Sequence, residues 1–191
     1  MFQLGTTSEF SHATDAVGRI VEVVSGQDLG AFIRAPHLCP TRPDGYRLRG
    51  AARLQADPVT NARQAIPDAL EKPRMCSGGS DMVSTAMGYA RLCQMLLNGG
   101  RLGEAELASR GTTELMTGNH LPEGTQYGPG LLVRFGGLAP APVTGYGFGF
   151  GFAVRMAQGR SPAPGSVGNY LCGGVHGTYF GATRRRTSTP C

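Results

Sequence analysis

Apolar side chains recur every three or four residues near the start of the chain. This spacing predicts an amphipathic helix with a buried apolar face, with Ser11 as its N-cap and Gly26 as the left-handed residue that ends it. An ordinary capped helix explains the pattern. The same geometry also holds short polar side chains at a helix N-terminus, where anionic groups are favoured. The predicted face consists of Ala13, Ala16, Val17, Ile20 and Val24.

Three further helices are expected along the chain. Residues 28–33 continue as a short helical segment, and residues 35–45, with three prolines, form a loop. A glycine-bearing loop at 76–80 precedes a helix that Ser84 caps and that runs to Asn98. Ser109 caps a last short helix through Met116. The apolar face of the helix that runs to Asn98 is predicted to consist of Ala86, Ala90, Cys93 and Leu97.

The second half of the chain changes to a two-residue period. Residues 147–156 alternate strictly and predict one strand, residues 157–168 a polar connection, and residues 169–180 a partner strand. A low-complexity Gly/Phe segment is the alternative for the first of these. The residues expected on one face of that strand are Phe148, Phe150, Phe152, Val154 and Met156.

Composition limits the class of protein. A chain of 191 residues with 40% hydrophobic residues is typical of a globular domain. No apolar run is long enough to span a membrane, and no signal peptide is visible, so a cytoplasmic location is expected if Met1 is the true start. The five cysteines form no C-x-x-C pair, so neither a zinc site nor a disulfide framework is predicted.

The net charge of +5 does not indicate a nucleic-acid partner. Residues 184–186, three consecutive arginines, supply much of that charge, and Lys72 is the only lysine. No aromatic residues interleave with a basic stripe, as single-strand nucleic-acid grooves require.

Several segments resemble the β-lactamase-related serine hydrolases, most closely the class C β-lactamase-like esterases. Residues 2–6, F-Q-L-G-T, are similar to the family's F-Q-P-G-T, and residues 9–26 resemble its Y-S motif and the helix ending in V-S-G. The resemblance covers most of residues 1–34, 71–135 and 147–180. It implies an α+β fold, a partial β-lactamase/transpeptidase-like domain with an antiparallel sheet flanked by helices over residues 1–180.

The resemblance also assigns site residues. Phe10 stands where the family has its proton-transferring Tyr, and Cys172-Gly173-Gly174 stands at the K-T-G, H-x-G or W-G-G strand motif. The amide near Val175 would be an oxyanion donor. The expected substrate-binding residues are Ser11, His12, Cys172, Gly173, Gly174, Val175 and His176. No metal and no cofactor are expected.

The family's nucleophile motif is missing from this sequence. Lys72, the only lysine, has Ala69 three residues before it, so no S-x-x-K exists, and no G-x-S-x-G occurs either. Losing the serine of a triad costs on the order of 10⁶ in rate, against ~10²–10⁴ for a general base. This chain alone is therefore expected to be inactive toward the small ester or amide substrates that the resemblance implies.

Two interpretations remain open. The chain is either the C-terminal portion of a serine hydrolase, with its nucleophile encoded elsewhere, or a catalytically dead remnant that binds an acyl ligand or a partner chain. No nucleic-acid or membrane partner is expected, whereas self-association through exposed sheet edges is. Residues 35–50 and the basic tail 181–191 depart from the family pattern, and both are compatible with a shifted reading frame. The tail is expected to lack a strand.

Overall fold

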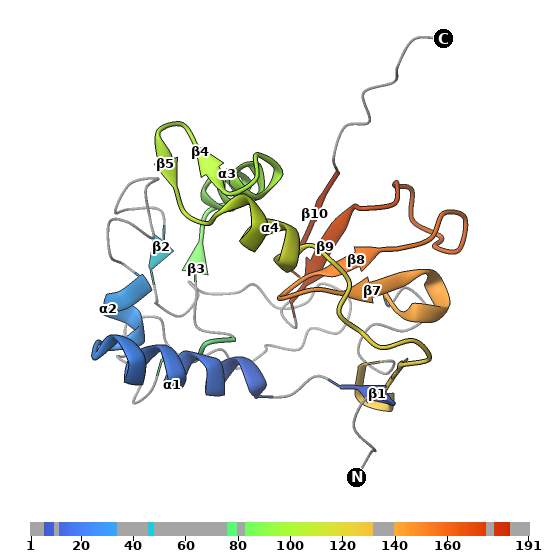
Figure 1. Ribbon diagram of the computed structural model, residues 1–191, viewed down its shortest axis with the longest axis horizontal. Helices are drawn as coiled ribbons and strands as arrows, with labels where there is room; N and C mark the ends of the chain where they lie inside the picture. The colour runs from blue at the N-terminus through green and yellow to red at the C-terminus, as the bar shows by residue number, and fades with distance from the viewer. Residues whose placement is uncertain are drawn as a thin grey trace, which may run out of the picture. The chain divides into compact units, whose positions relative to one another are not determined.

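The computed structural model describes residues 6–9, 12–33, 46–47, 76–79, 83–131, 140–174 and 178–183, with backbone alone for 46–47 and 83–84. The chain divides into two compact units. Met1–Phe10 and Cys93–Cys191 form the sheet unit, and Ser11–Leu92 forms the α1 unit (Figure 1). The predicted loop at 35–45 lies outside the described residues.

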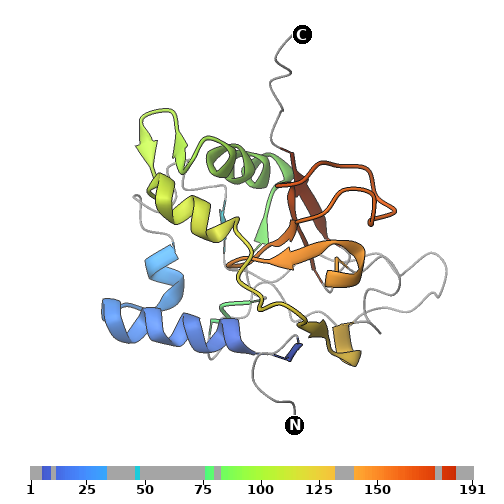
Figure 2. The ribbon, with the colours of Figure 1, turned by 45° about the vertical axis from the view of Figure 1, so that its right-hand side comes forward.

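A four-stranded antiparallel sheet forms the centre of the sheet unit, with strand order β10-β9-β8-β7 (Figure 2). Its core centres on Tyr170, which is fully buried. The ring of Phe152 lies 5.4 Å from the Tyr170 ring and 5.8 Å from the Phe180 ring, the latter edge-on. The strands are β7 (Tyr146–Phe148), β8 (Ala153–Arg155), β9 (Tyr170–Gly173) and β10 (Tyr179–Ala182).

Residues 147–156 form a hairpin, so the prediction of one continuous strand was wrong. The Gly149 amide donates to the Phe152 carbonyl over 2.8 Å, and Gly151 has φ +97°, a conformation that favours glycine. Because of the turn, the two aromatic residues lie in different environments: Phe150 is 58% exposed, whereas Phe152 is only 8% exposed. Glycine at alternate positions mimics strand periodicity while supplying the turn that breaks the strand.

The connection from β8 to β9 is held by a buried arginine. Residues 157–168 have the predicted polar, irregular structure. Arg155, 2% exposed, donates from Nη2 to the Ala163 carbonyl over 2.7 Å, and its guanidinium lies over the Tyr146 ring at 5.6 Å. Arg155 of β8 therefore ties the connection to the sheet.

The prediction of one partner strand at 169–180 was wrong, because the segment contains two strands, β9 and β10, which pair with each other. β10 extends two residues beyond the predicted end of the family-like region. Gly181 pairs with Leu171, and Ala182, which is buried, pairs with Tyr170. The expectation that the tail contains no strand was wrong for these two residues. The remainder of the tail, 184–191, lies outside the described residues.

Two pairs of short strands complete the sheet unit. β4 (Arg101–Leu102) and β5 (Ala105–Glu106) form an antiparallel hairpin. β1 (Thr7–Ser8) pairs in parallel with β6 (Gln126–Tyr127), which brings the start of the chain beside its middle. Tyr127 and Ala141, the latter before the short 3₁₀ helix η2 (Pro142–Thr144), form a small core with Leu121 and Leu131.

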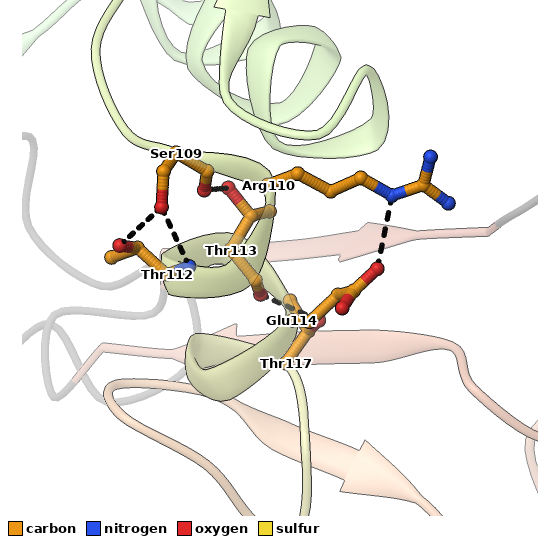
Figure 3. A network of polar contacts seen from close by, with 6 residues as sticks. All are labelled: Ser109, Arg110, Thr112, Thr113, Glu114 and Thr117. Carbon is orange, nitrogen blue, oxygen red and sulfur yellow. Dashed lines mark hydrogen bonds and ion pairs between the residues drawn. The ribbon is translucent and has the colours of Figure 1, made fainter.

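Helix α4 (Arg110–Met116) confirms the predicted cap and bounds. The Ser109 hydroxyl accepts from the Thr112 amide over 3.1 Å, as Figure 3 shows. The Thr113 hydroxyl donates to the Ser109 carbonyl over 3.1 Å, and the Thr113 side chain is fully buried. Exposed Arg110 and Glu114 form an i,i+4 ion pair over 3.0 Å. Cap and buried hydroxyl together fix this helix at its first turn.

Helix α3 (Ala86–Leu97) begins later than predicted. Ser84 belongs to β3 (Val83–Ser84), which pairs with β2 (Tyr46–Arg47). Thr85 takes the cap position instead, because its hydroxyl accepts from the Gly88 amide over 3.0 Å. The predicted apolar face was also wrong, since Ala86 and Ala90 are exposed. The buried residues of α3 are Gly88, Met95 and Leu96.

Helix α1 (Ala13–Ser25) and the short α2 (Leu29–Ile33) follow one another in the α1 unit. Gly26 ends α1 as predicted, with φ 68° and its amide donating to the Glu22 carbonyl over 2.9 Å. The helix begins one residue later than predicted, because the N-cap position is occupied by His12, whose side chain makes no capping hydrogen bond. Ser11 lies outside the described residues.

The apolar face of α1 is exposed, so the prediction that it is buried was wrong. Val17, Ile20 and Val24 are 57%, 60% and 81% exposed, while Gly18 is buried. Leu29 and the loop at 76–79 contact the opposite, polar face of the helix. The amphipathic pattern identifies the helix correctly but not the side on which its neighbours lie.

Candidate functional site

The predicted site residues divide between the two units. His12 belongs to the α1 unit, and Cys172, Gly173 and Gly174 belong to the sheet unit. Phe10, Ser11, Val175 and His176 lie outside the described residues.

At the N-terminus of α1, a carboxylate joins His12 to the loop at 76–79. Asp15 Oδ2 lies 3.0 Å from His12 Nδ1, and Asp15 Oδ1 accepts a short hydrogen bond from the Ser77 hydroxyl. The Ser77 hydroxyl, the His12 side chain and the Gly79 amide, in that order, lower the pKa of the Asp15 carboxyl. Asp15 is consequently an anion at neutral pH, bound by the Ser77 hydroxyl and in contact with His12, while the Ser77 oxygen accepts from the Gly79 amide over 3.1 Å.

Two glycines bring the loop onto the helix. A Cβ on Gly78 would lie far inside van der Waals contact with the Thr14 carbonyl oxygen and 3.3 Å from the Gly18 Cα. A Cβ on Gly18 would lie 2.9 Å from Leu29 Cδ2. Gly18 and Gly78 therefore permit a close backbone approach that places Ser77 within reach of Asp15.

This arrangement determines what His12 can do chemically. A carboxylate only accepts hydrogen bonds, so a neutral His12 carries its hydrogen on Nδ1 and keeps the Nε2 lone pair for a proton. The His12 side chain is 98% exposed, so Nε2 is accessible to a ligand. The contact with Asp15 restrains the orientation of the imidazole ring. Ser77 donates to the carboxylate and not to the imidazole, so His12 does not activate it as a nucleophile.

The second predicted group lies at the end of β9. Cys172 pairs with Phe180 of β10, and the Gly174 amide donates to the Thr178 carbonyl over 2.7 Å. A Cβ on Gly174 would overlap the Thr178 hydroxyl. Burial raises the pKa of the Cys172 thiol, so this side chain is a neutral thiol at neutral pH and cannot replace the charge of a lysine.

A third group surrounds the carboxylate of Glu9. The Gly130 amide donates to Glu9 Oε2 over 3.1 Å, and the position of a Gly128 Cβ is filled by the same oxygen. Glu9 immediately follows β1, so this contact fixes the chain directly before Phe10 to the sheet unit. The Gly130 amide thus holds the carboxylate at the end of the β1 segment.

Sequence reasoning missed Asp15, Ser77 and Glu9. A signal existed for Asp15, because an acidic residue three positions after His12 in a first helical turn lies on the same face. Ser77 and Glu9 gave no such signal, since their partners lie 62 and 121 residues away along the chain.

Neither a metal-ligand cluster nor a membrane-spanning helix occurs in the part of the chain that the structure describes. No three His, Cys, Asp or Glu side chains there gather in a way that could hold a metal ion. No helix there has the length and apolar character needed to cross a bilayer.

The fold is similar to that of several solved proteins. EstCE1, a hydrolase with promiscuous acyltransferase activity, has a TM-score of 0.63 to the chain at 22% identity, over 94% of this chain and 49% of EstCE1. A mutant of the simvastatin synthase LovD from Aspergillus terreus has a TM-score of 0.64 at 18% identity, over 93% of this chain and 47% of the LovD chain. A predicted β-lactamase from Bacteroides dorei DSM 17855 has a TM-score of 0.58 at 18% identity, over 96% of this chain and 48% of the β-lactamase chain.

These likenesses establish an α+β fold of the β-lactamase-like type, as predicted. Nearly all of the chain is matched, yet it spans only about half the length of the solved chains. No family model and no curated protein sequence matches the chain.

Proposed function

We propose that this chain is one half of a β-lactamase-like acyl hydrolase or acyltransferase, in which the nucleophilic serine belongs to a different segment. The observation that carries the proposal is the match over 93–96% of this chain to only 47–49% of three solved chains. The sequence lacks S-x-x-K, which is the part of the machinery that such a half would have to receive.

In the parent reaction, the serine would attack a small ester or amide, and water or another acceptor would release the acyl group. This half would contribute the wall of the site: the Glu9-anchored segment that leads to Phe10, the orienting pair His12 and Asp15, and the Cys172-Gly173-Gly174 strand. Backbone amides of such a wall would stabilise the oxyanion.

The alternative is a remnant that binds an acyl ligand or a partner chain without chemistry. Two residues favour it: Phe10 stands in place of a proton-transferring Tyr and has no exchangeable proton, and the neutral thiol of Cys172 lacks the charge of a lysine. The two proposals agree that the chain by itself does not turn over.

The test is to incubate the purified chain with p-nitrophenyl butyrate, a chromogenic cephalosporin and a fluorophosphonate probe, with EstCE1 as the positive control. We expect hydrolysis and labelling no greater than those of the heat-denatured chain. Labelling together with turnover would disprove the proposal. Sequencing the surrounding locus then separates the two readings, because a hydrolase half requires S-x-x-K to be encoded nearby and a remnant does not.

A further inference from the structure

Helix α1 presents its hydrophobic side to solvent. Val17, Ile20 and Val24 occupy positions i, i+3 and i+7, so they form a continuous stripe along one side of the helix. Each of these side chains is more than half exposed, and the flanking Ala13 and Ala16 are exposed as well. Contiguous exposed aliphatic residues of this kind mark an interaction surface. We call these five residues the α1 stripe.

The helix cannot turn the α1 stripe inward, because its other face is already engaged. A Cβ on Gly18 would lie 2.9 Å from Leu29 Cδ2 and 3.3 Å from Gly78 Cα, so these two residues leave no room for a side chain there. Glu22 Oε1 accepts from the Leu29 amide over 3.0 Å, and its Oε2 accepts from Arg19 over 2.7 Å. Asp15 is bound by Ser77 at the same side. Rolling the helix by half a turn would break its contacts with Leu29, Ser77 and Gly78.

The chemistry of the α1 stripe specifies an apolar partner. It carries no charged residue and no side chain that donates or accepts a hydrogen bond. Positions i, i+3 and i+7 are the anchors through which one helix packs along another helix or in a groove. A nucleic acid, a sugar or a charged peptide would find no complementary group there.

We propose that the α1 stripe is the docking surface for the half of the β-lactamase-like fold that this chain does not contain. The solved chains supply about twice the length of this one, while this chain is matched almost throughout. A half-fold with an uncovered apolar helix face is complementary to a second half that has its own uncovered face. This inference rests on the proposed function and names the partner that the function requires.

The experiment uses the absence of tryptophan from the chain. Ile20→Trp places a single fluorophore at the centre of the α1 stripe, and Gln27→Trp, beyond the helix at an exposed position, is the matched control. The probe is a polypeptide comprising the part of EstCE1 that has no counterpart in this chain. We expect the emission of Ile20→Trp to shift to shorter wavelength on titration with the probe, and that of Gln27→Trp to stay unchanged.

Charge substitutions then test whether the α1 stripe itself makes the contact. Ile20→Asp and Val24→Asp, each checked for helix content by circular dichroism, should weaken probe binding at least tenfold, whereas Gln27→Asp should not. Two substitutions at exposed positions keep the test informative if one variant fails to fold.

Four results would overturn the inference. The Ile20→Trp side chain could be shielded in the monomer without the probe, which would assign the α1 stripe to the chain's own sheet unit. Self-association lost in Ile20→Asp would assign it to a second copy. Probe binding that Ile20→Asp leaves unchanged, or no binding of the probe at all, would exclude the α1 stripe as the docking surface. Because the readout is binding, a bound but inactive pair would refute the hydrolase function and leave the docking surface intact.

Discussion

Replacing Gly78 with alanine is the sharpest test of how the loop at 76–79 meets α1. The new Cβ would overlap the Thr14 carbonyl oxygen and lie 3.0 Å from the carbonyl carbon. Thr14 is part of α1, so its carbonyl cannot move without disturbing the helix. The loop must therefore retreat and release the Ser77 hydroxyl from Asp15.

The magnitude follows from two opposing effects. Overpacking costs about 1–3 kcal/mol, and replacing a glycine restricts the unfolded chain and returns about 0.4–1 kcal/mol. The clash is with backbone, so we expect the upper part of the range and a net loss of about 2 kcal/mol. That loss corresponds to a roughly 30-fold larger equilibrium constant for opening of the loop–helix contact.

Two measurements report the change. Hydrogen exchange at the α1 amides should accelerate, and the pKa of the Asp15 carboxyl, measured by NMR titration, should rise toward its ordinary value as Ser77 withdraws. Ser77→Ala separates the effects, because it removes the hydroxyl without adding a clash. Gly111→Ala in α4 is the matched control, since only the Ser109 hydroxyl lies near its Cβ, at 4.0 Å. It should stabilise that helix by up to about 1 kcal/mol.

An unchanged Asp15 pKa together with unchanged exchange in Gly78→Ala would refute the reasoning, because the loop could not then be pressed against the helix. If the Asp15 pKa rises in Ser77→Ala but not in Gly78→Ala, the Ser77–Asp15 hydrogen bond is supported and the steric argument is wrong.

Three further predictions concern the cap, the carboxylate and the thiol. Ser109→Ala should destabilise α4 by about 1 kcal/mol, which faster hydrogen exchange of the Thr112 amide would report. Ser109→Asp should restore the cap, so equal exchange rates in the two variants would contradict the prediction. The Asp15 pKa is lower in the folded chain, so its stabilisation is complete above the unfolded pKa of about 4 and is lost as the pH falls through the lowered value. Denaturation midpoints from pH 6 to 2 should show this loss in the parent and less of it in Asp15→Asn; identical profiles would exclude it. Burial raises the pKa of Cys172, so iodoacetamide at pH 8 should alkylate this thiol at least tenfold more slowly in the folded than in the urea-unfolded chain, and equal rates would show it to be accessible.

The sequence predicts helices best where one residue type has a single physical role. Ser109 caps α4, and Gly26 ends α1, because each satisfies backbone groups of its own helix within three or four residues. Local chemistry of this kind needs no knowledge of distant segments. The resemblance then supplies the fold class, which the structure confirms.

Predictions failed where the outcome depends on distant partners. Periodicity identifies the apolar face of α1 but cannot show that Gly18, Asp15 and Glu22 make the contacts within the unit. The hairpin at residues 149–152 was missed because its glycines fit strand alternation as well as a turn. In the candidate site, Ser77 and Glu9 were missed because each reaches its partner across a long stretch of chain.

The parallel pairing of β1 with β6 has a consequence for the order of assembly. Glu9 and Gly130 are separated by 121 residues, and the whole α1 unit lies between them in the sequence. Closing so long a segment costs about 2 kcal/mol more entropy than closing one of ten residues, and β1 must wait until β6 has been synthesised. During translation, the first strand therefore stays unpaired while the α1 unit emerges from the ribosome. Chaperones that protect nascent strands would therefore have time to bind β1 before β6 is available to pair with it.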